Sequence, residues 1–280
     1  MISALLKVPR DCLGFGACGN GFIFGKISIF DQNRRIYEGG KYNQPFLIDS
    51  SAFSNENTQN LTFVVHRSIK YLLIVEKQTM FRKLCKGKWT PENSILFTGR
   101  GYPPLIVRSV ISALVNSLKK RGRDLEMYCF VDGDPHGIDI FLAYQQGTIN
   151  APESYNYALP NLMYIGLEWN DINAFKISKN RALEMNQEDR KKVKALCQYL
   201  ERKKEFYFDK FEIKKDSVQY LTHKRIWNQL EMLSKVHKKM EIDVIDNLDG
   251  LYLPRKVAKM REYYGLNIQS ASYVMDVDSK

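Results

Sequence analysis

Three carboxylates in this 280-residue sequence have the spacing of a metal site. Glu76 directly follows the apolar run Tyr71–Val75, and Asp132 and Asp134 directly follow Met127–Val131. Both runs are typical of buried strands, and ligands of a parallel sheet bind beyond the carboxyl ends of its strands. Three acids gathered there repel one another unless a cation joins them, and hard oxygen ligands suit Mg²⁺, with Mn²⁺ as an alternative. The spacing therefore predicts a Mg²⁺ site at Glu76, Asp132 and Asp134.

Two alternatives remain open for the Asp-x-Asp pair. Asp134 precedes Pro135, and its side chain can N-cap a helix that begins near Ile138. Nucleotide-sugar transferases also use an Asp-x-Asp pair, but neither Glu76 nor the basic C-terminal region supports that function. Asp139, one turn into the expected helix, either supports a metal ligand or is an ordinary helix-surface residue.

The elements that must position these acids alternate between strand and helix. This alternation predicts an α/β fold with a parallel sheet flanked by helices. Residues 8–30 are glycine-rich and β-like, and residues 31–60 are polar and predicted as loop. Besides the two strands above, we expect strands at 94–98 and 162–166 and helices at 77–86, 107–118 and 138–144.

The C-terminal third is basic and mostly helical. Residues 176–261 contain 22 Lys and Arg against 13 Asp and Glu, most of the chain's net charge of +11. Asn186 followed by Asp189 predicts a helix N-terminus, and a long helix is expected from about Thr222 to Val244. The charge indicates a nucleic acid partner, although a solvated pair of Lys-rich helices would look the same. We interpret this region as an extension of the α/β domain.

Composition excludes several classes of protein. Apolar residues make up 44% and charged residues 26%, which is ordinary for a folded domain and not for a disordered chain or a collagen. No apolar run approaches the roughly 20 residues that span a bilayer, and the first residues are too short for a signal peptide, so we expect an intracellular protein with no membrane partner. The five cysteines lack zinc-site spacing.

Several motifs together resemble a known family. The segments are Leu73–Lys77, Thr98–Pro103, Val131–Ile140 and Gly250–Lys256, with Gly19–Gly25 leading into them. They are similar to the Toprim domain of the A subunit of topoisomerase VI, and even more to its eukaryotic relative, the meiotic proteins that make the double-strand breaks initiating recombination. The resemblance covers residues 8–260 and keeps the family's motif order.

The resemblance implies a fold, a reaction and partners. It implies a lead-in to the Toprim domain at 1–65, a Toprim core at 66–175 and a basic helical extension at 176–280. It also implies a type IIB-like topoisomerase, of an ATP-hydrolysing class, that acts in the nucleus as a homodimer on double-stranded DNA. The expected partners are other meiotic break-forming proteins and a topoisomerase VI B-like subunit. A tyrosine of one protomer attacks DNA at the Mg²⁺ site of the other protomer, leaving a 5′-phosphotyrosyl link.

The sequence departs from the family pattern in two places. The nucleophilic tyrosine of the family lies in an upstream winged-helix domain, but the first tyrosine here is Tyr37. We therefore expect the nucleophile to be absent and the chain alone to be inactive. Asn20 stands where the family usually has Lys, which puts one DNA contact in doubt.

Five residues are candidates for DNA contacts. Arg100 and Tyr102 lie in the loop after the expected strand at 94–98, at the same edge as the acids. There Arg can pair with phosphate, and an aromatic ring can stack at a base step. Arg108 follows on the next helix. His136 contacts phosphate or caps locally, and Lys77 either tempers the acidic cluster or contacts DNA. Packing of Tyr102 under Pro103 and a plain surface role for Arg108 are the alternatives.

Two rival functions use the same motifs. One is a catalytically inactive DNA-binding or scaffold protein, which the missing tyrosine favours. The other is a primase-like or nuclease-like Toprim enzyme, which needs no tyrosine, but the match to the closing motif at Tyr252–Pro254 argues against it.

Overall fold

The computed structural model describes residues 21–32, 34–39, 44–49, 52–53, 58–148, 152–204 and 213–266. Asn20 and the predicted β-like residues 8–20 lie outside these ranges. The strands are β1 (Gly21–Phe24), β2 (Ile27–Asp31), β3 (Arg34–Glu38), β4 (Phe46–Ile48), β5 (Leu61–Val65), β6 (Tyr71–Val75), β7 (Ser94–Thr98), β8 (Glu126–Phe130), β9 (Met163–Tyr164), β10 (Leu183–Glu184) and β11 (Lys238–Lys239). The α-helices are α2 (Gln78–Cys85), α3 (Trp89–Asn93), α4 (Leu105–Lys120), α5 (Pro135–Gln146), α6 (Trp169–Ala174), α7 (Gln187–Lys203), α8 (Val218–Val236) and α9 (Leu253–Tyr263).

A six-stranded sheet in the order β4-β1-β7-β6-β8-β9 forms the centre of the molecule. Strands β7, β6, β8 and β9 are parallel, whereas β1 pairs antiparallel with β4 and β7. Every side chain of β6 and β7 is buried, as expected for central strands covered on both faces. The predicted strands at 71–75, 94–98 and 127–131 are thereby confirmed, the last shifted by one residue.

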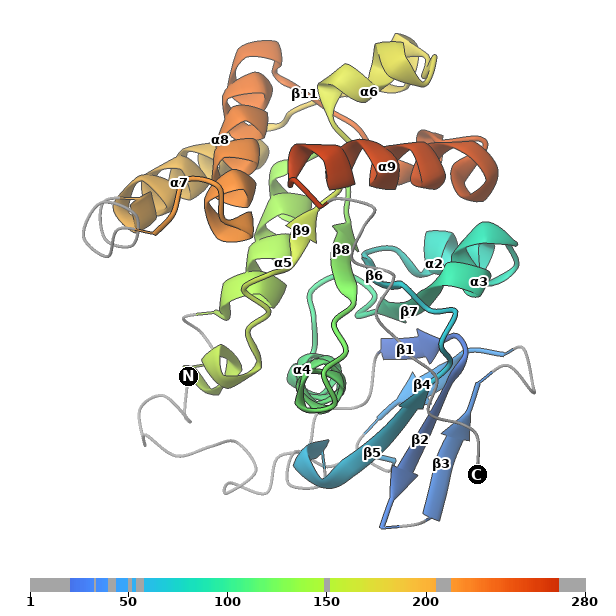
Figure 1. Cartoon of the computed structure of the whole chain (residues 1–280). Coiled ribbons are helices and arrows are strands. Elements are labelled where there is room, and N and C mark those ends of the chain that lie inside the picture. The colour runs from blue at the N-terminus through green and yellow to red at the C-terminus, as the bar shows by residue number, and fades with distance from the viewer. Residues whose placement is uncertain are drawn as a thin grey trace.

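Helices cover both faces of this sheet (Figure 1). Alternate residues of β6 separate into two cores because successive side chains of a strand point to opposite faces. Leu72 and Ile74 pack with α4, α5, α7 and α8, whereas Leu73 and Val75 pack with α2 and α9. The basic extension therefore contributes to both cores.

A smaller antiparallel sheet, β3-β2-β5, continues the first core. The prediction of loop over residues 31–60 is wrong, because β3, β4 and the 3₁₀ turn Thr58–Asn60 lie within it. Strand β3 buries only Tyr37, so the apolar alternation that reveals a strand is almost absent from its sequence.

The predicted long helix, about Thr222 to Val244, differs from the structure at both ends, because α8 begins four residues earlier, at Val218. Helix α7 begins as predicted, with a capping box in which Asn186 and Asp189 each accept the other's backbone N–H. Helix α8 ends at Val236, because His237 adopts the left-handed conformation (φ 56°). Met240 and Val244 therefore lie outside this helix, although their spacing continues its apolar stripe. None of the helices in the described ranges is long and apolar enough to cross a membrane.

Candidate metal centre

The three predicted acids lie at one edge of the sheet. Glu76 follows β6, and Asp132 and Asp134 follow the neighbouring parallel strand β8. The Glu76 backbone N–H donates to the Phe130 carbonyl over 3.0 Å, and the Glu76 carboxylate accepts the Asp132 backbone N–H over 2.8 Å. The strand ends are thus joined through the acidic residues themselves. We call Glu76, Asp132 and Asp134 the carboxylate edge.

Asp132 is held by contacts from distant parts of the chain. Its Oδ1 accepts the backbone N–H of Ile242 over 2.7 Å, and its Oδ2 lies 3.2 Å from the Lys77 Nζ. The residue is 5% exposed. Its carboxylate is therefore fixed between helix α2 and the segment that follows β11.

Asp134 caps a helix, as one alternative from the sequence predicted. Its Oδ1 accepts the backbone N–H of Gly137 over 2.7 Å at the start of α5. A β-carbon on Gly137 would lie 2.5 Å from the Asp132 carbonyl oxygen, so only glycine permits this close turn. The cap uses one carboxylate oxygen and leaves the metal prediction for Asp134 a prediction.

The carboxylate edge has too little positive charge to neutralise its acids. Burial and the neighbouring charge of Asp132 raise the pKa of Glu76 to about 8, and burial raises the pKa of Asp132 to about 6. Lys77 shows the opposite response: although burial lowers its pKa, hydrogen bonds to Asp243 and Glu241 raise it overall. Bringing a further cation to this edge would relieve the repulsion between the acids.

The donor set fits a hard divalent cation in type and charge, because all three groups offer carboxylate oxygens. In the described part of the chain, no three His, Cys, Asp or Glu side chains lie close enough together, as they stand, to hold a metal ion. Glu76 and Asp132 instead each accept a backbone N–H. Binding one ion through all three acids would require their side chains to rotate.

The loop that contains Arg100 and Tyr102 is tied to Glu76. The Glu76 carbonyl accepts the Gly101 backbone N–H over 3.1 Å and the Thr98 hydroxyl over 3.3 Å. Arg100 adopts φ 59° and its guanidinium lies 5.8 Å from the centre of the Phe22 ring. Tyr102 is 55% exposed, so the alternative of packing under Pro103 is not what the structure shows. Both residues stand beside the carboxylate edge.

Arg108 is not available to DNA, which corrects the sequence prediction. It is 2% exposed, and its guanidinium donates to the Ser154 carbonyl over 2.9 Å. Burial lowers its pKa to about 10. The helical pattern around Arg108 did not show this, because the segment that covers its side chain lies far along the sequence.

His136 and Lys77 occupy different surroundings. His136 is exposed on the first turn of α5, with its Nε2 3.4 Å from the Asp189 Oδ1. The Lys77 Nζ lies 2.8 Å from Glu241, 2.7 Å from Asp243 and 3.2 Å from Asp132. This position agrees with a role for Lys77 in offsetting the negative charge of the acids.

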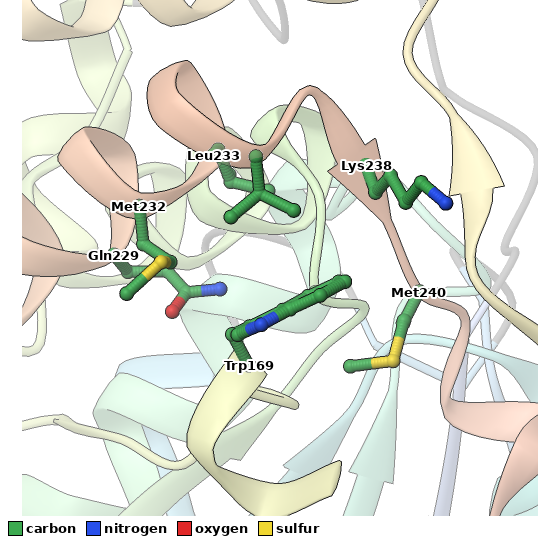
Figure 2. A pocket seen from close by; sticks show the side chains of 8 residues that line it. Trp169, Gln229, Met232, Leu233, Lys238 and Met240 are labelled. Carbon is green, nitrogen blue, oxygen red and sulfur yellow. The ribbon is translucent and has the colours of Figure 1, made fainter. Parts of the chain in front are cut away.

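Gly133, in the segment Asp132–Asp134 that we call the acidic turn, lines a water-sized cavity. Figure 2 shows the Trp169 ring between Met232 and Gln229 on one side and Met240 on the other. The cavity is too small for a substrate, so it is not the candidate site.

Comparison with known proteins identifies the family of this chain. The family model for the Toprim domain of Spo11 and of the topoisomerase 6 A subunit matches residues 71–257. The chain belongs to this family. Its parallel sheet with flanking helices is a Toprim domain, as the resemblance implied.

Relatives within this family include meiotic recombination proteins and the A subunit of a type 2 DNA topoisomerase. Meiotic recombination protein SPO11 of Mus musculus is 27% identical over 265 residues, covering 91% of this chain and 59% of that protein. Meiotic recombination protein SPO11-1 of Oryza sativa subsp. japonica is 28% identical over 197 residues, 70% of this chain and 49% of that protein. The A subunit of type 2 DNA topoisomerase 6 from Aeropyrum pernix is 28% identical over 236 residues, which cover 80% of this chain and 56% of that protein. The chain thus spans about half the length of the relatives it matches.

The family's closing motif, Gly250–Lys256, belongs to a second charged group that sequence reasoning did not find. The Lys256 Nζ, fully buried, lies 2.5 Å from Asp171 and 3.1 Å from Glu168, and the Tyr252 hydroxyl donates to Asp171 over 2.9 Å. Arg225 also pairs with Glu168. We call Glu168, Asp171, Arg225, Tyr252 and Lys256 the anchor cluster. Its only signal in the sequence was the motif itself.

Proposed function

We propose that this chain is the Toprim half of a DNA-cleaving, topoisomerase VI A-like protein that makes the double-strand breaks initiating meiotic recombination. The observation that carries the proposal is the carboxylate edge, placed at the carboxyl ends of two parallel strands within a chain of this family. The names of the relatives, which are meiotic recombination proteins and part of a type 2 DNA topoisomerase, support both halves of the proposal.

In this proposal Glu76, Asp132 and Asp134 hold Mg²⁺ or Mn²⁺. The bound ion would offset charge on the scissile phosphate. The protein's own part is to keep the three carboxylates at one edge of the sheet, with Asp132 buried and Glu76 and Asp134 half-buried. The backbone N–H groups of Asp132, Ile242 and Gly137 each hold one oxygen of Glu76, Asp132 and Asp134 respectively.

The DNA contacts fall to groups around the same edge. Arg100 and Tyr102 stand on the loop fixed to the Glu76 carbonyl, so a phosphate contact and a stacked base there would be held in register with the acids. His136 is exposed at the start of α5 and is the third candidate contact. Lys77 acts on the acids and not on DNA, because three carboxylates already surround its ammonium.

The attacking tyrosine would come from a domain outside these 280 residues. Its hydroxyl would lose its proton to solvent and attack phosphorus. The 5′-phosphotyrosyl bond would form as the bond from phosphorus to the 3′ oxygen breaks, and that oxygen would take up a proton and leave as a 3′ hydroxyl. Tyr71 and Tyr128 cannot serve, since both lie in the sheet and are buried. The proposal includes a homodimer on double-stranded DNA in the nucleus, with other break-forming proteins, the ATP-dependent type IIB class and a topoisomerase VI B-like subunit.

A thermal melt with and without Mn²⁺ tests the metal site. We expect Mn²⁺ to raise the melting temperature of the natural chain, and this rise to disappear in Asp132→Asn. Asp124→Asn, a change of the same kind at an exposed residue, should keep it. An unchanged Mn²⁺ response in Asp132→Asn would show that the site is elsewhere.

Incubation with labelled duplex DNA and Mn²⁺ tests the source of the nucleophile. We expect the 280-residue chain to bind the duplex and to form no covalent adduct. An adduct that disappears in Tyr102→Phe would show that the nucleophile lies within the chain.

A further inference from the structure

A short segment from the basic extension crosses the carboxylate edge. Met240 and Gly133 exchange backbone hydrogen bonds of 2.8 and 3.2 Å, and two residues later the Ile242 N–H donates to Asp132. We call Met240–Asp243 the strap. Because it is pinned to the acidic turn by backbone bonds, the side chains of Glu241 and Asp243 are held beside that turn.

The strap contributes two further carboxylates, Glu241 and Asp243, and both bind the Lys77 ammonium. The Lys77 Nζ lies 2.8 Å from the Glu241 Oε2 and 2.7 Å from the Asp243 Oδ2, but 3.2 Å from the Asp132 Oδ2. Asp243 is itself held by the Thr79 hydroxyl over 3.2 Å, from the first turn of α2. Lys77 is therefore shared between the strap and Asp132, and its shorter contacts are to the strap.

This sharing has a consequence for any cation that approaches Asp132. An ammonium beside that carboxylate repels a divalent ion and competes for the same oxygens. The more strongly Glu241 and Asp243 retain the ammonium, the less it satisfies Asp132. The charges of Glu241 and Asp243 also neutralise Lys77. When a divalent ion takes the Asp132 oxygens, the partly buried ammonium is therefore not left without a partner.

We propose that Glu241 and Asp243 are positioning residues that set the divalent-cation affinity of the carboxylate edge by holding the Lys77 ammonium. This inference rests on the proposed metal site at Glu76, Asp132 and Asp134. Neither strap residue ligates the ion in this scheme. Both act through Lys77, which links helix α2 to the strap.

A double-mutant cycle on the full chain, with Mn²⁺ affinity measured by titration calorimetry at fixed ionic strength, tests the inference. Lys77→Met should tighten Mn²⁺ binding by about tenfold, because one competing charge is removed from a partly screened site. The pair Glu241→Gln and Asp243→Asn should weaken it by about tenfold in the natural background. In the Lys77→Met background the same pair should change it less than about twofold.

The outcomes separate the inference from simpler explanations. Damage to the fold cannot tighten metal binding, so tighter binding in Lys77→Met is not a general structural effect. Lys83→Met, which removes a charge from the exposed face of α2, should leave the affinity unchanged. Equal weakening by the strap pair in both backgrounds would mean that its carboxylates act on the ion directly and would overturn the inference. If Asp132→Asn binds Mn²⁺ like the natural chain, the metal site itself is wrong.

Discussion

The carboxylate edge and the anchor cluster are both charged groups with buried and half-buried members, but their charges balance differently. The anchor cluster pairs the two acids Glu168 and Asp171 with the two cations Arg225 and Lys256, and the Tyr252 hydroxyl adds a hydrogen bond. Of the three acids at the carboxylate edge, Asp132 pairs with the Lys77 ammonium, which two strap carboxylates also bind. The anchor cluster has equal numbers of acids and cations, whereas the carboxylate edge has more acids than cations.

The difference separates a structural role from a functional one. Burying a charge is tolerated when it is paired and hydrogen-bonded. The anchor cluster joins α6, α8 and α9 in this way. At the carboxylate edge, burial first and the neighbouring charge of Asp132 second raise the pKa of Glu76, so keeping this acid ionised there costs free energy. Such a cost is typical of sites that bind a ligand or do chemistry.

The largest expected effect comes from unbalancing the anchor cluster. Lys256→Met should lower the free energy of unfolding by about 3–5 kcal/mol, because it leaves Asp171 as a buried acid without its ammonium. Urea denaturation at neutral pH measures this. Adding Asp171→Asn should recover part of the loss. A Lys256→Met chain as stable as the natural one would remove the distinction between the two groups.

The sequence was sufficient for the centre of the fold because local and tertiary signals agree there. The fully buried runs of β6 and β7 reveal central strands, and the acids that follow β6 and β8 were found by position alone. The cap at Asn186 was equally visible, since its capping box is a local pattern.

The remainder depends on contacts between distant segments. Arg108 looked like a surface residue until Ser154 was placed over it. The strap lies about 110 residues from Asp132 along the chain, and nothing in its composition shows which acids it meets. Strand β3 is stabilised by pairing with β2, with a single buried side chain to reveal it.

A smaller effect should come from removing one charge from the carboxylate edge by Glu76→Gln. With its pKa raised to about 8 from an ordinary 4.5, Glu76 retains its proton in the folded chain over a range where the unfolded chain loses it. The unfolded state then binds fewer protons, so stability without metal falls as pH rises from about 4.5 to about 8. Glu76→Gln should remove the part of this decline that Glu76 causes, leave the part that Asp132 causes below about pH 6, and add at least about 1 kcal/mol at pH 8, because one pKa unit corresponds to about 1.4 kcal/mol.

Urea denaturation across this pH range, in the presence of a chelator, measures the Glu76 effect. Glu92→Gln, at an exposed acid on α3, serves as the control and should keep the decline. A Glu76→Gln chain that is less stable than the natural chain at pH 8 would place the carboxylate edge with the anchor cluster, as a group built for stability.

The smallest expected effect concerns which end of the sheet faces DNA. Arg100 stands at the carboxyl end beside Glu76, whereas Arg67, also exposed, precedes β6 at the opposite end. Each neutralised phosphate contributes about −0.9 to the slope of log affinity against log salt. Arg100→Gln should therefore make the slope for duplex binding shallower by about 0.9 and weaken binding a few-fold, whereas Arg67→Gln should leave both unchanged.

A fluorescence titration at several salt concentrations measures both variants. Equal slopes for Arg100→Gln and the natural chain would mean that DNA does not reach this edge through Arg100, and a change confined to Arg67→Gln would place DNA at the amino end, away from the acids.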